Sequence, residues 1–187
     1  MRHPSLQKAC LSLEKATQAY ETLCTCRDFK TFRFAWADFL QAHNHVFSML
    51  ANWAKDRPKH NAWYGCVRKI RREDELLSYV HQARNAFEHG TQEIHGESGP
   101  KFVYKLKGPM LLVPNGIQIL GEVTESQEWK PPSPELHTFI NSKKSYAPPK
   151  RHLGSQIPDP TPQKVAELGI TFAELKLQEA EERELEG

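Results

Sequence analysis

The sequence predicts a mainly α-helical protein, a four- to five-helix up-and-down bundle with a small antiparallel β insertion before the last helix. Apolar residues recur every three to four positions through most of residues 5–89 and again after residue 161, which is the period of amphipathic helices. Between these stretches, short β-branched and aromatic runs alternate with turn-forming residues. With 39% hydrophobic residues among 187, the chain can build one core. We therefore expect a single domain over residues 1–187, with a β-ribbon and Pro-rich insertion over residues 91–160.

Each expected helix has recognisable ends. Pro58 is expected to stop the second helix, because proline inside a helix removes a hydrogen bond and clashes with the preceding turn. Residues 59–72 are expected to form a connection or a short helical turn, and Gly90 to end the third helix. Thr161 is a good N-cap with Pro162 at the first helical position. The expected helices span residues 5–23, 29–55, about 73–89, and from 162 onwards.

Two residues within the helices call for an explanation. His43 lies in the apolar stripe of the second helix, and we expect a hydrogen-bonded histidine in or at the edge of the core. Gly169 lies inside the last helix, where glycine is unfavourable, so we expect either a kink or unusually close packing there.

The insertion is expected to contain a two- or three-stranded antiparallel ribbon. Its strands are Phe102–Leu106 and Ile117–Val123, and Pro114–Gly116 between them is a turn signal. Residues 130–160 contain many prolines and are expected to be mostly extended, with Leu136–Ile140 pairing with the ribbon.

Composition excludes several functional classes. A net charge of +2 does not by itself indicate a nucleic-acid-binding protein. No apolar run approaches the roughly 18–20 residues of a membrane span, and no signal-peptide core is present, so we expect a cytoplasmic protein. Four cysteines without two metal-type pairs indicate free thiols, and no metal or cofactor is expected. The motifs of zinc proteases and of α/β-hydrolases are absent.

The end of the third expected helix combines groups that can cleave a phosphodiester. His81, Asn85 and His89 are four residues apart and form one polar stripe, with Arg84 beside Asn85. Histidine can move a proton near neutral pH, and arginine can bind a phosphate at two points. These groups suit attack of an RNA 2′-hydroxyl on the adjacent phosphate without a metal. Alternatively, Arg84 and His89 only complete the helix end by binding carbonyls, and Glu88 pairs with Arg84.

The string Arg84-Asn85-Ala-Phe-Glu-His89 resembles the R-x4-6-H motif of HEPN domains, in the form with a polar residue after the arginine. The resemblance implies a helical bundle that forms a homodimer, with motifs from two subunits in one cleft. It also implies a metal-independent endoribonuclease, such as a toxin or a stress or defence effector, with an antitoxin or regulatory protein as a further partner. By position, Arg84 would bind phosphate and Asn85 would assist it. His89 would be the catalytic base or would position the 2′-hydroxyl. The alternative is a non-catalytic binding or dimerisation protein on the same fold.

A basic cluster precedes the motif. Arg68, Lys69, Arg71 and Arg72 are candidates for binding the RNA backbone, or form an ordinary solvated surface. If one helix joined this cluster to the motif, about 17 residues at 1.5 Å each would separate them by roughly 25 Å. The cluster is therefore expected to contact RNA away from the motif of its own subunit, or at the cleft of a second subunit.

Overall fold

The structure, a computed structural model, describes residues 3–55, 57–88, 94–99, 101–105, 110–113, 116–119, 126–130 and 133–186. The chain divides into two compact units, residues 1–96 with 134–187 and residues 97–133. The first unit contains the helices. In the described part of the chain these are α1 (Pro4–Thr25), α2 (Phe29–Ala54), α3 (Pro58–Glu73), α4 (Glu75–Glu88) and α5 (Pro162–Glu186).

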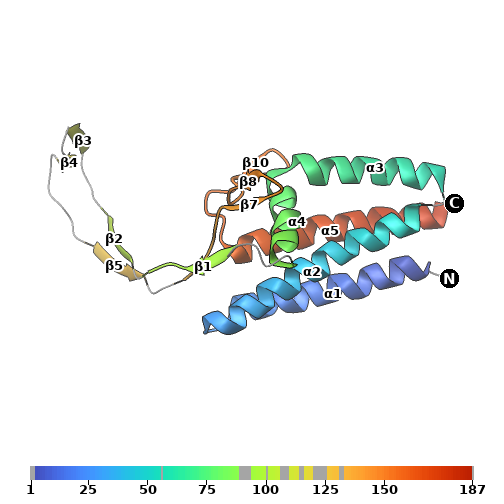
Figure 1. Cartoon of the computed structure of the whole chain (residues 1–187), viewed down its shortest axis with the longest axis horizontal. Helices are drawn as coiled ribbons and strands as arrows, with labels where there is room; N and C mark the ends of the chain where they lie inside the picture. Colours follow the sequence, from blue (N-terminus) through green and yellow to red (C-terminus); the bar gives the residue numbers. More distant parts are fainter. Residues whose placement is uncertain are drawn as a thin grey trace. The chain divides into compact units, whose positions relative to one another are not determined.

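The helical unit is a bundle, as the sequence predicts. Four helices (α1, α2, α3 and α5) lie along a common direction and alternate in sense, whereas α4 crosses them (Figure 1). The short link between α1 and α2 makes them antiparallel neighbours. Small antiparallel strand pairs lie between α4 and α5 in the sequence. No helix in the described residues is long and apolar enough to cross a membrane.

Helix α2 forms the centre of the core. Its N-cap is Asp28, whose Oδ1 accepts a hydrogen bond from the Thr31 amide at 2.8 Å. The apolar stripe predicted for this helix is fully buried, with Trp36 and Phe39 at 0% exposure. Its other members are also buried, namely Phe32, Val46, Leu50 and Trp53.

His43 of α2 and Gly169 of α5 contact each other, which accounts for the presence of both residues within their helices. The Nε2 atom of the buried His43 donates a hydrogen bond to the Gly169 carbonyl at 3.2 Å, which joins α2 to α5. A Cβ atom at Gly169 would lie 3.4 Å from both His43 Nε2 and Phe39 Cζ, so glycine permits close packing here, one of the two outcomes expected. Burial lowers the pKa of His43 to about 3, and the side chain is therefore neutral at physiological pH.

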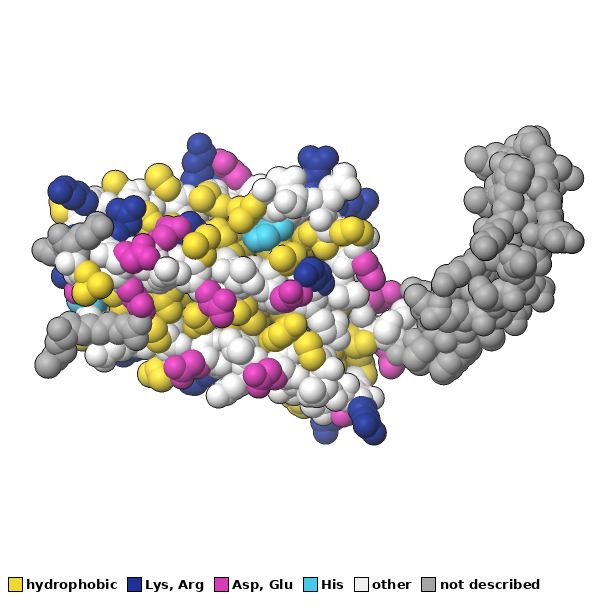
Figure 2. All heavy atoms as spheres, turned by 180° about the vertical axis from the view of Figure 1, so that it is seen from behind, with side chains coloured by type: hydrophobic (Ala, Val, Ile, Leu, Met, Phe, Trp, Pro, Cys, Tyr) yellow, Lys and Arg dark blue, Asp and Glu magenta, His cyan; other side chains and the backbone are white. Residues whose placement is uncertain are grey.

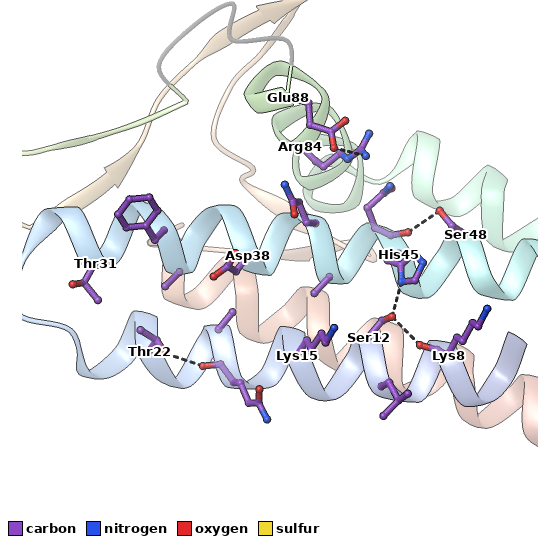
Figure 3. A pocket seen from close by; sticks show the side chains of 18 residues that line it. Lys8, Ser12, Lys15, Thr22, Thr31, Asp38, His45, Ser48, Arg84 and Glu88 are labelled. Atoms are coloured by element: carbon purple, nitrogen blue, oxygen red, sulfur yellow. Dashed lines mark hydrogen bonds and ion pairs between the residues drawn. The ribbon is translucent and has the colours of Figure 1, made fainter. Parts of the chain in front are cut away.

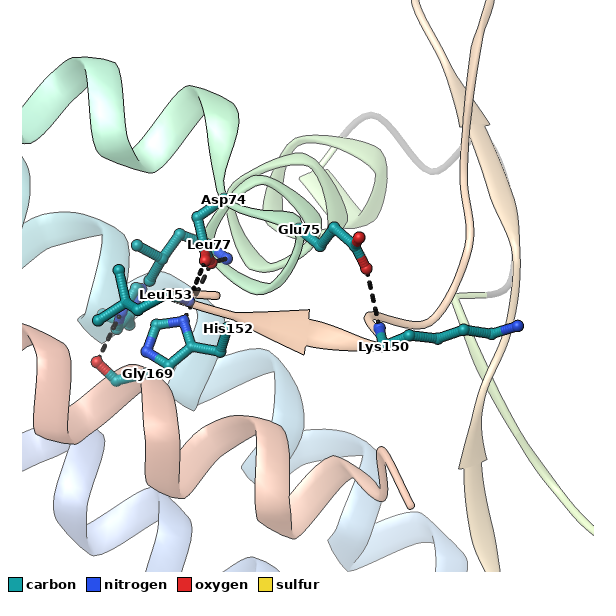
Figure 4. A network of polar contacts seen from close by, with 8 residues as sticks. Asp74, Glu75, Leu77, Lys150, His152, Leu153 and Gly169 are labelled. Atoms are coloured by element: carbon teal, nitrogen blue, oxygen red, sulfur yellow. Dashed lines mark hydrogen bonds and ion pairs between the residues drawn. The ribbon is translucent and has the colours of Figure 1, made fainter. Parts of the chain in front are cut away.

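The region between α2 and α4 differs from the prediction. Residues 58–73 form a full helix and not a connection, and Pro58 begins this helix because proline is well suited to its first turn. Only two positions of α3, His60 and Val67, are buried, so its sequence carries little of the apolar pattern that marks a helix. Helix α4 is a separate element. Asp74 leaves the helical conformation and caps α4, with its Oδ1 accepting from the Leu77 amide at 2.9 Å (Figure 4).

The described parts of residues 97–133 contain two antiparallel strand pairs. Strand β2 (Lys101–Lys105) pairs with β5 (Ser126–Lys130), and β3 (Met110–Val113) pairs with β4 (Gly116–Ile119). Residues 114 and 115 of the predicted turn lie outside the described residues, between β3 and β4 in the sequence. Strands β2 and β4 overlap the two runs from which the sequence predicts a two- or three-stranded ribbon, and β3 and β5 are further strands.

Residues 134–160 belong to the helical unit and not to residues 97–133. The predicted pairing of residues 136–140 with the ribbon is wrong. Strand β6 (Pro134–Leu136) pairs with β1 (His95–Glu97), and β7 (Phe139–Asn141) pairs with β8 (Lys144–Tyr146). Positive φ angles at Ser142 and Lys143 allow the two-residue turn of the β7–β8 hairpin. Another hairpin pairs β9 (Arg151–His152) with β10 (Ser155–Gln156).

The start of α5 is as predicted. The Thr161 hydroxyl accepts a hydrogen bond from the Lys164 amide at 3.2 Å, and Pro162 occupies the first helical position.

Candidate functional site

A groove of about 930 Å³ lies along α1 and α2, beside the end of α4 (Figure 3). Helix α4 contributes Arg84 and Glu88 to its wall, and the other polar groups come from α1 and α2. The charged side chains that line it carry both signs. They are Lys8, Lys15 and Arg84 on the basic side and Asp38 and Glu88 on the acidic side.

Arg84 is held at two points. One terminal nitrogen is 2.5 Å from the Glu88 carboxylate, the i,i+4 pair expected from the sequence, and the other donates to Asn85 Oδ1 at 3.3 Å. Ala83 and Ala86 pack into the core and fix this part of α4. The Arg84 side chain is 30% exposed, which leaves part of it accessible from the groove. Arg84 is therefore a cation held in position, in part by Asn85, beside an open cavity.

His89, the third residue of the motif, lies outside the described residues. The structure thus places two of the three predicted catalytic residues, Arg84 and Asn85, and brings them into contact.

His81, one turn before Asn85, belongs to a second polar cluster. Asn44 Oδ1 accepts hydrogen bonds from His81 Nδ1 at 3.1 Å and from an Arg71 terminal nitrogen at 3.3 Å. Since a carbonyl oxygen only accepts, the proton of neutral His81 is on Nδ1. Burial, with Arg71 and Arg84 nearby, lowers the pKa of His81 to about 4. His81 is therefore uncharged at neutral pH.

The basic cluster of α3 does not act as one surface. Arg68, Lys69 and Arg72 are exposed, whereas the Arg71 guanidinium lies over the Phe47 ring at 3.9 Å. Arg71 reaches Asn44 and hence α4, so the large separation expected from one continuous helix does not hold for this residue. The reason is the break at Asp74, after which the chain changes direction.

Sequence reasoning missed one polar pair in the groove. Ser12 on α1 is buried, and its Oγ lies 2.7 Å from Nδ1 of His45 on α2 (Figure 3). Neither residue belongs to a motif, and 33 positions separate them, so no sequence pattern predicts this contact.

The face of the helical unit in Figure 2 does not favour one sign of ligand. Acidic and basic side chains are both spread over the face of the helical unit in Figure 2. This agrees with the low net charge, and attraction of an anionic substrate would have to be local. Among the described side chains, no group of three or more His, Cys, Asp or Glu could hold a metal ion.

No protein-family model, curated protein or solved structure matches the chain. Arg84, Asn85 and the groove beside them are the features that bear on function.

Proposed function

We propose that the protein is a metal-independent endoribonuclease of the HEPN type, acting as a toxin or as a stress or defence effector. The observation that carries this proposal is the Arg84–Asn85 contact at the wall of an open groove. A fixed guanidinium at a cavity can bind a phosphate and stabilise the extra negative charge that develops when the 2′-hydroxyl attacks it.

In this proposal each motif residue has one role. Arg84 binds the scissile phosphate, and Asn85 keeps the guanidinium in place. His89 removes the proton of the 2′-hydroxyl or positions that hydroxyl. Cleavage leaves a 2′,3′-cyclic phosphate on one fragment and a 5′-hydroxyl on the other.

We further propose that the protein acts as a homodimer. Large apolar side chains are exposed around the site, with Phe34 at 62%, Leu11 at 56% and Phe87 at 38%. Phe34 and Leu11 line the groove, and Phe87 lies on α4 between Arg84 and Glu88 in the sequence. A second copy of the chain would cover this apolar surface and bring a second motif to the first.

The proposal is tested by incubating the protein with RNA in EDTA. We expect cleavage to 2′,3′-cyclic phosphate ends, no cleavage of a DNA oligonucleotide of the same sequence, and loss of activity in His89→Ala. His137→Ala, which alters a histidine outside the groove lining, is the matched control and should cleave normally. A folded wild-type protein that leaves diverse RNAs intact would contradict the proposal.

Glu88 is expected to restrain the site. Glu88→Gln removes the carboxylate that holds the Arg84 guanidinium and repels phosphate, so we expect about two- to fivefold faster cleavage at low substrate concentration. The measurement is kcat/KM for a short fluorescent RNA. A tenfold fall would instead show that Glu88 positions Arg84 for the reaction.

The second candidate function is RNA or nucleotide binding without cleavage. It is favoured by the ion pair with Glu88, because a guanidinium already paired is less available to a phosphate. In that case the wild-type protein would bind RNA in a manner that depends on Arg84 and would form no product.

A further inference from the structure

The Ser12–His45 pair fixes the position of a proton. The Ser12 hydroxyl donates its single proton to the Lys8 carbonyl at 2.8 Å, as serine often does within a helix. Ser12 Oγ can then only accept from His45 Nδ1, which lies 2.7 Å away. The neutral ring of His45 therefore carries its proton on Nδ1, and its Nε2 atom carries none.

His45 is also accessible. Its side chain is exposed and lines the same groove as Arg84 (Figure 3). Within the described part of the chain, the contact with Ser12 is the only hydrogen bond found for its side chain. An imidazole held at one nitrogen, with no partner at the other among the described residues, is suited to proton transfer at a phosphate in a groove that also holds the Arg84 guanidinium.

We infer that His45 is the general acid of this groove and protonates the 5′-oxygen that leaves. This role rests on the proposed ribonuclease function. The base of that proposal takes the 2′-hydroxyl proton, the O2′–P bond forms, the P–O5′ bond breaks, and His45 Nε2 gives its proton to O5′. The base has then gained one proton and His45 has lost one, and exchange with water restores both.

The surroundings of His45 support the acid role. A protonated imidazole carries a hydrogen on both nitrogens, and the acceptor at Ser12 serves the Nδ1 hydrogen in the charged as in the neutral ring. The groove lining also holds charged side chains of both signs, Asp38 and Glu88 together with Lys8 and Lys15. Arg84 would be occupied by the phosphate during the reaction.

The test compares an ordinary RNA with one in which sulfur replaces the bridging 5′-oxygen at the cleavage site. A thiolate leaves without protonation, so it does not need a general acid. We expect His45→Ala to slow cleavage of the ordinary RNA by about 10²- to 10⁴-fold, and cleavage of the sulfur-containing RNA by less than about tenfold. His45→Asn can still donate to Ser12, but a neutral amide cannot act as a general acid, so this variant should behave in the same way. This second variant guards against a folding defect in the first.

Each outcome decides the inference. Equal slowing of both substrates would overturn the acid role. Normal cleavage by His45→Ala, with Arg84→Ala inactive, would overturn the role of His45 and leave the proposed function intact. A wild-type protein that cleaves neither substrate would overturn both.

Discussion

Arg84→Ala is expected to lower kcat/KM for RNA cleavage at least about a hundredfold, the usual effect of removing one preorganised donor to a developing negative charge. Arg84 is the guanidinium that the structure fixes at the groove wall, between Asn85 and Glu88. Steady-state cleavage of a short fluorescent RNA measures the effect. Stability should change little, since a partly exposed i,i+4 ion pair contributes only about 0.5 kcal/mol.

Two further variants make this result specific. Arg84→Lys keeps the charge but cannot bind a phosphate at two points, so its activity should lie between those of the wild type and Arg84→Ala. Arg151→Ala removes an exposed arginine of β9 outside the groove lining and should cleave as the wild type does. Full activity in Arg84→Ala would show that the groove is not the site of cleavage.

The parts of the fold that the sequence predicts well are those fixed by local pattern. The apolar stripe of α2 and the cap at Thr161 depend on residues within one or two turns of each other. The Arg84–Glu88 pair is also local, because residues four apart on a helix are neighbours. For the same reason, Arg84 and Asn85 could be singled out before their surroundings were known.

The parts that were missed depend on partners far along the chain. Helix α3 buries little apolar surface, and an acidic run at residues 73–75 is equally typical of a helix start and of a helix break. The contacts of Arg71 with Asn44 and of Ser12 with His45 join different helices, and sequence spacing carries no information on them. The pairing of β2 with β5 likewise skips the two strands between them.

Asp74→Ala is expected to destabilise the helical unit by about 2–4 kcal/mol, because one buried carboxylate serves three partners. Its Oδ1 accepts from the Leu77 amide at 2.9 Å and from His152 Nδ1 at 3.0 Å, and its Oδ2 accepts from the Leu153 amide at 2.7 Å (Figure 4). The Asp74 side chain is only 8% exposed. The substitution would therefore uncap α4 and release the β9–β10 hairpin. Urea unfolding followed by circular dichroism measures the loss.

Asp28→Ala is the matched control, since Asp28 also caps a helix but is exposed and, in the described part of the chain, its side chain hydrogen-bonds only at the start of α2. The loss of unfolding free energy in Asp28→Ala should be clearly smaller than in Asp74→Ala. An equal loss in the two variants would show that the hairpin contacts of Asp74 contribute nothing to stability. Hydrogen exchange adds a local test, because amide protection at residues 151–156 should fall in Asp74→Ala and persist in Asp28→Ala.

The contribution of Asp74 is also expected to depend on pH. Burial raises the pKa of this carboxyl, but the hydrogen bonds from His152, Leu153 and Leu77 outweigh burial, and the pKa is lowered overall. A carboxyl with a lowered pKa in the folded state stabilises the protein above its unfolded pKa of about 3.9, and loses that effect as the pH falls through the folded value. The difference in unfolding free energy between the wild type and Asp74→Asn should therefore be constant from about pH 5 upwards and shrink below about pH 4. A difference that stays constant into acid would mean that the charge of Asp74 is not what holds the hairpin to α4.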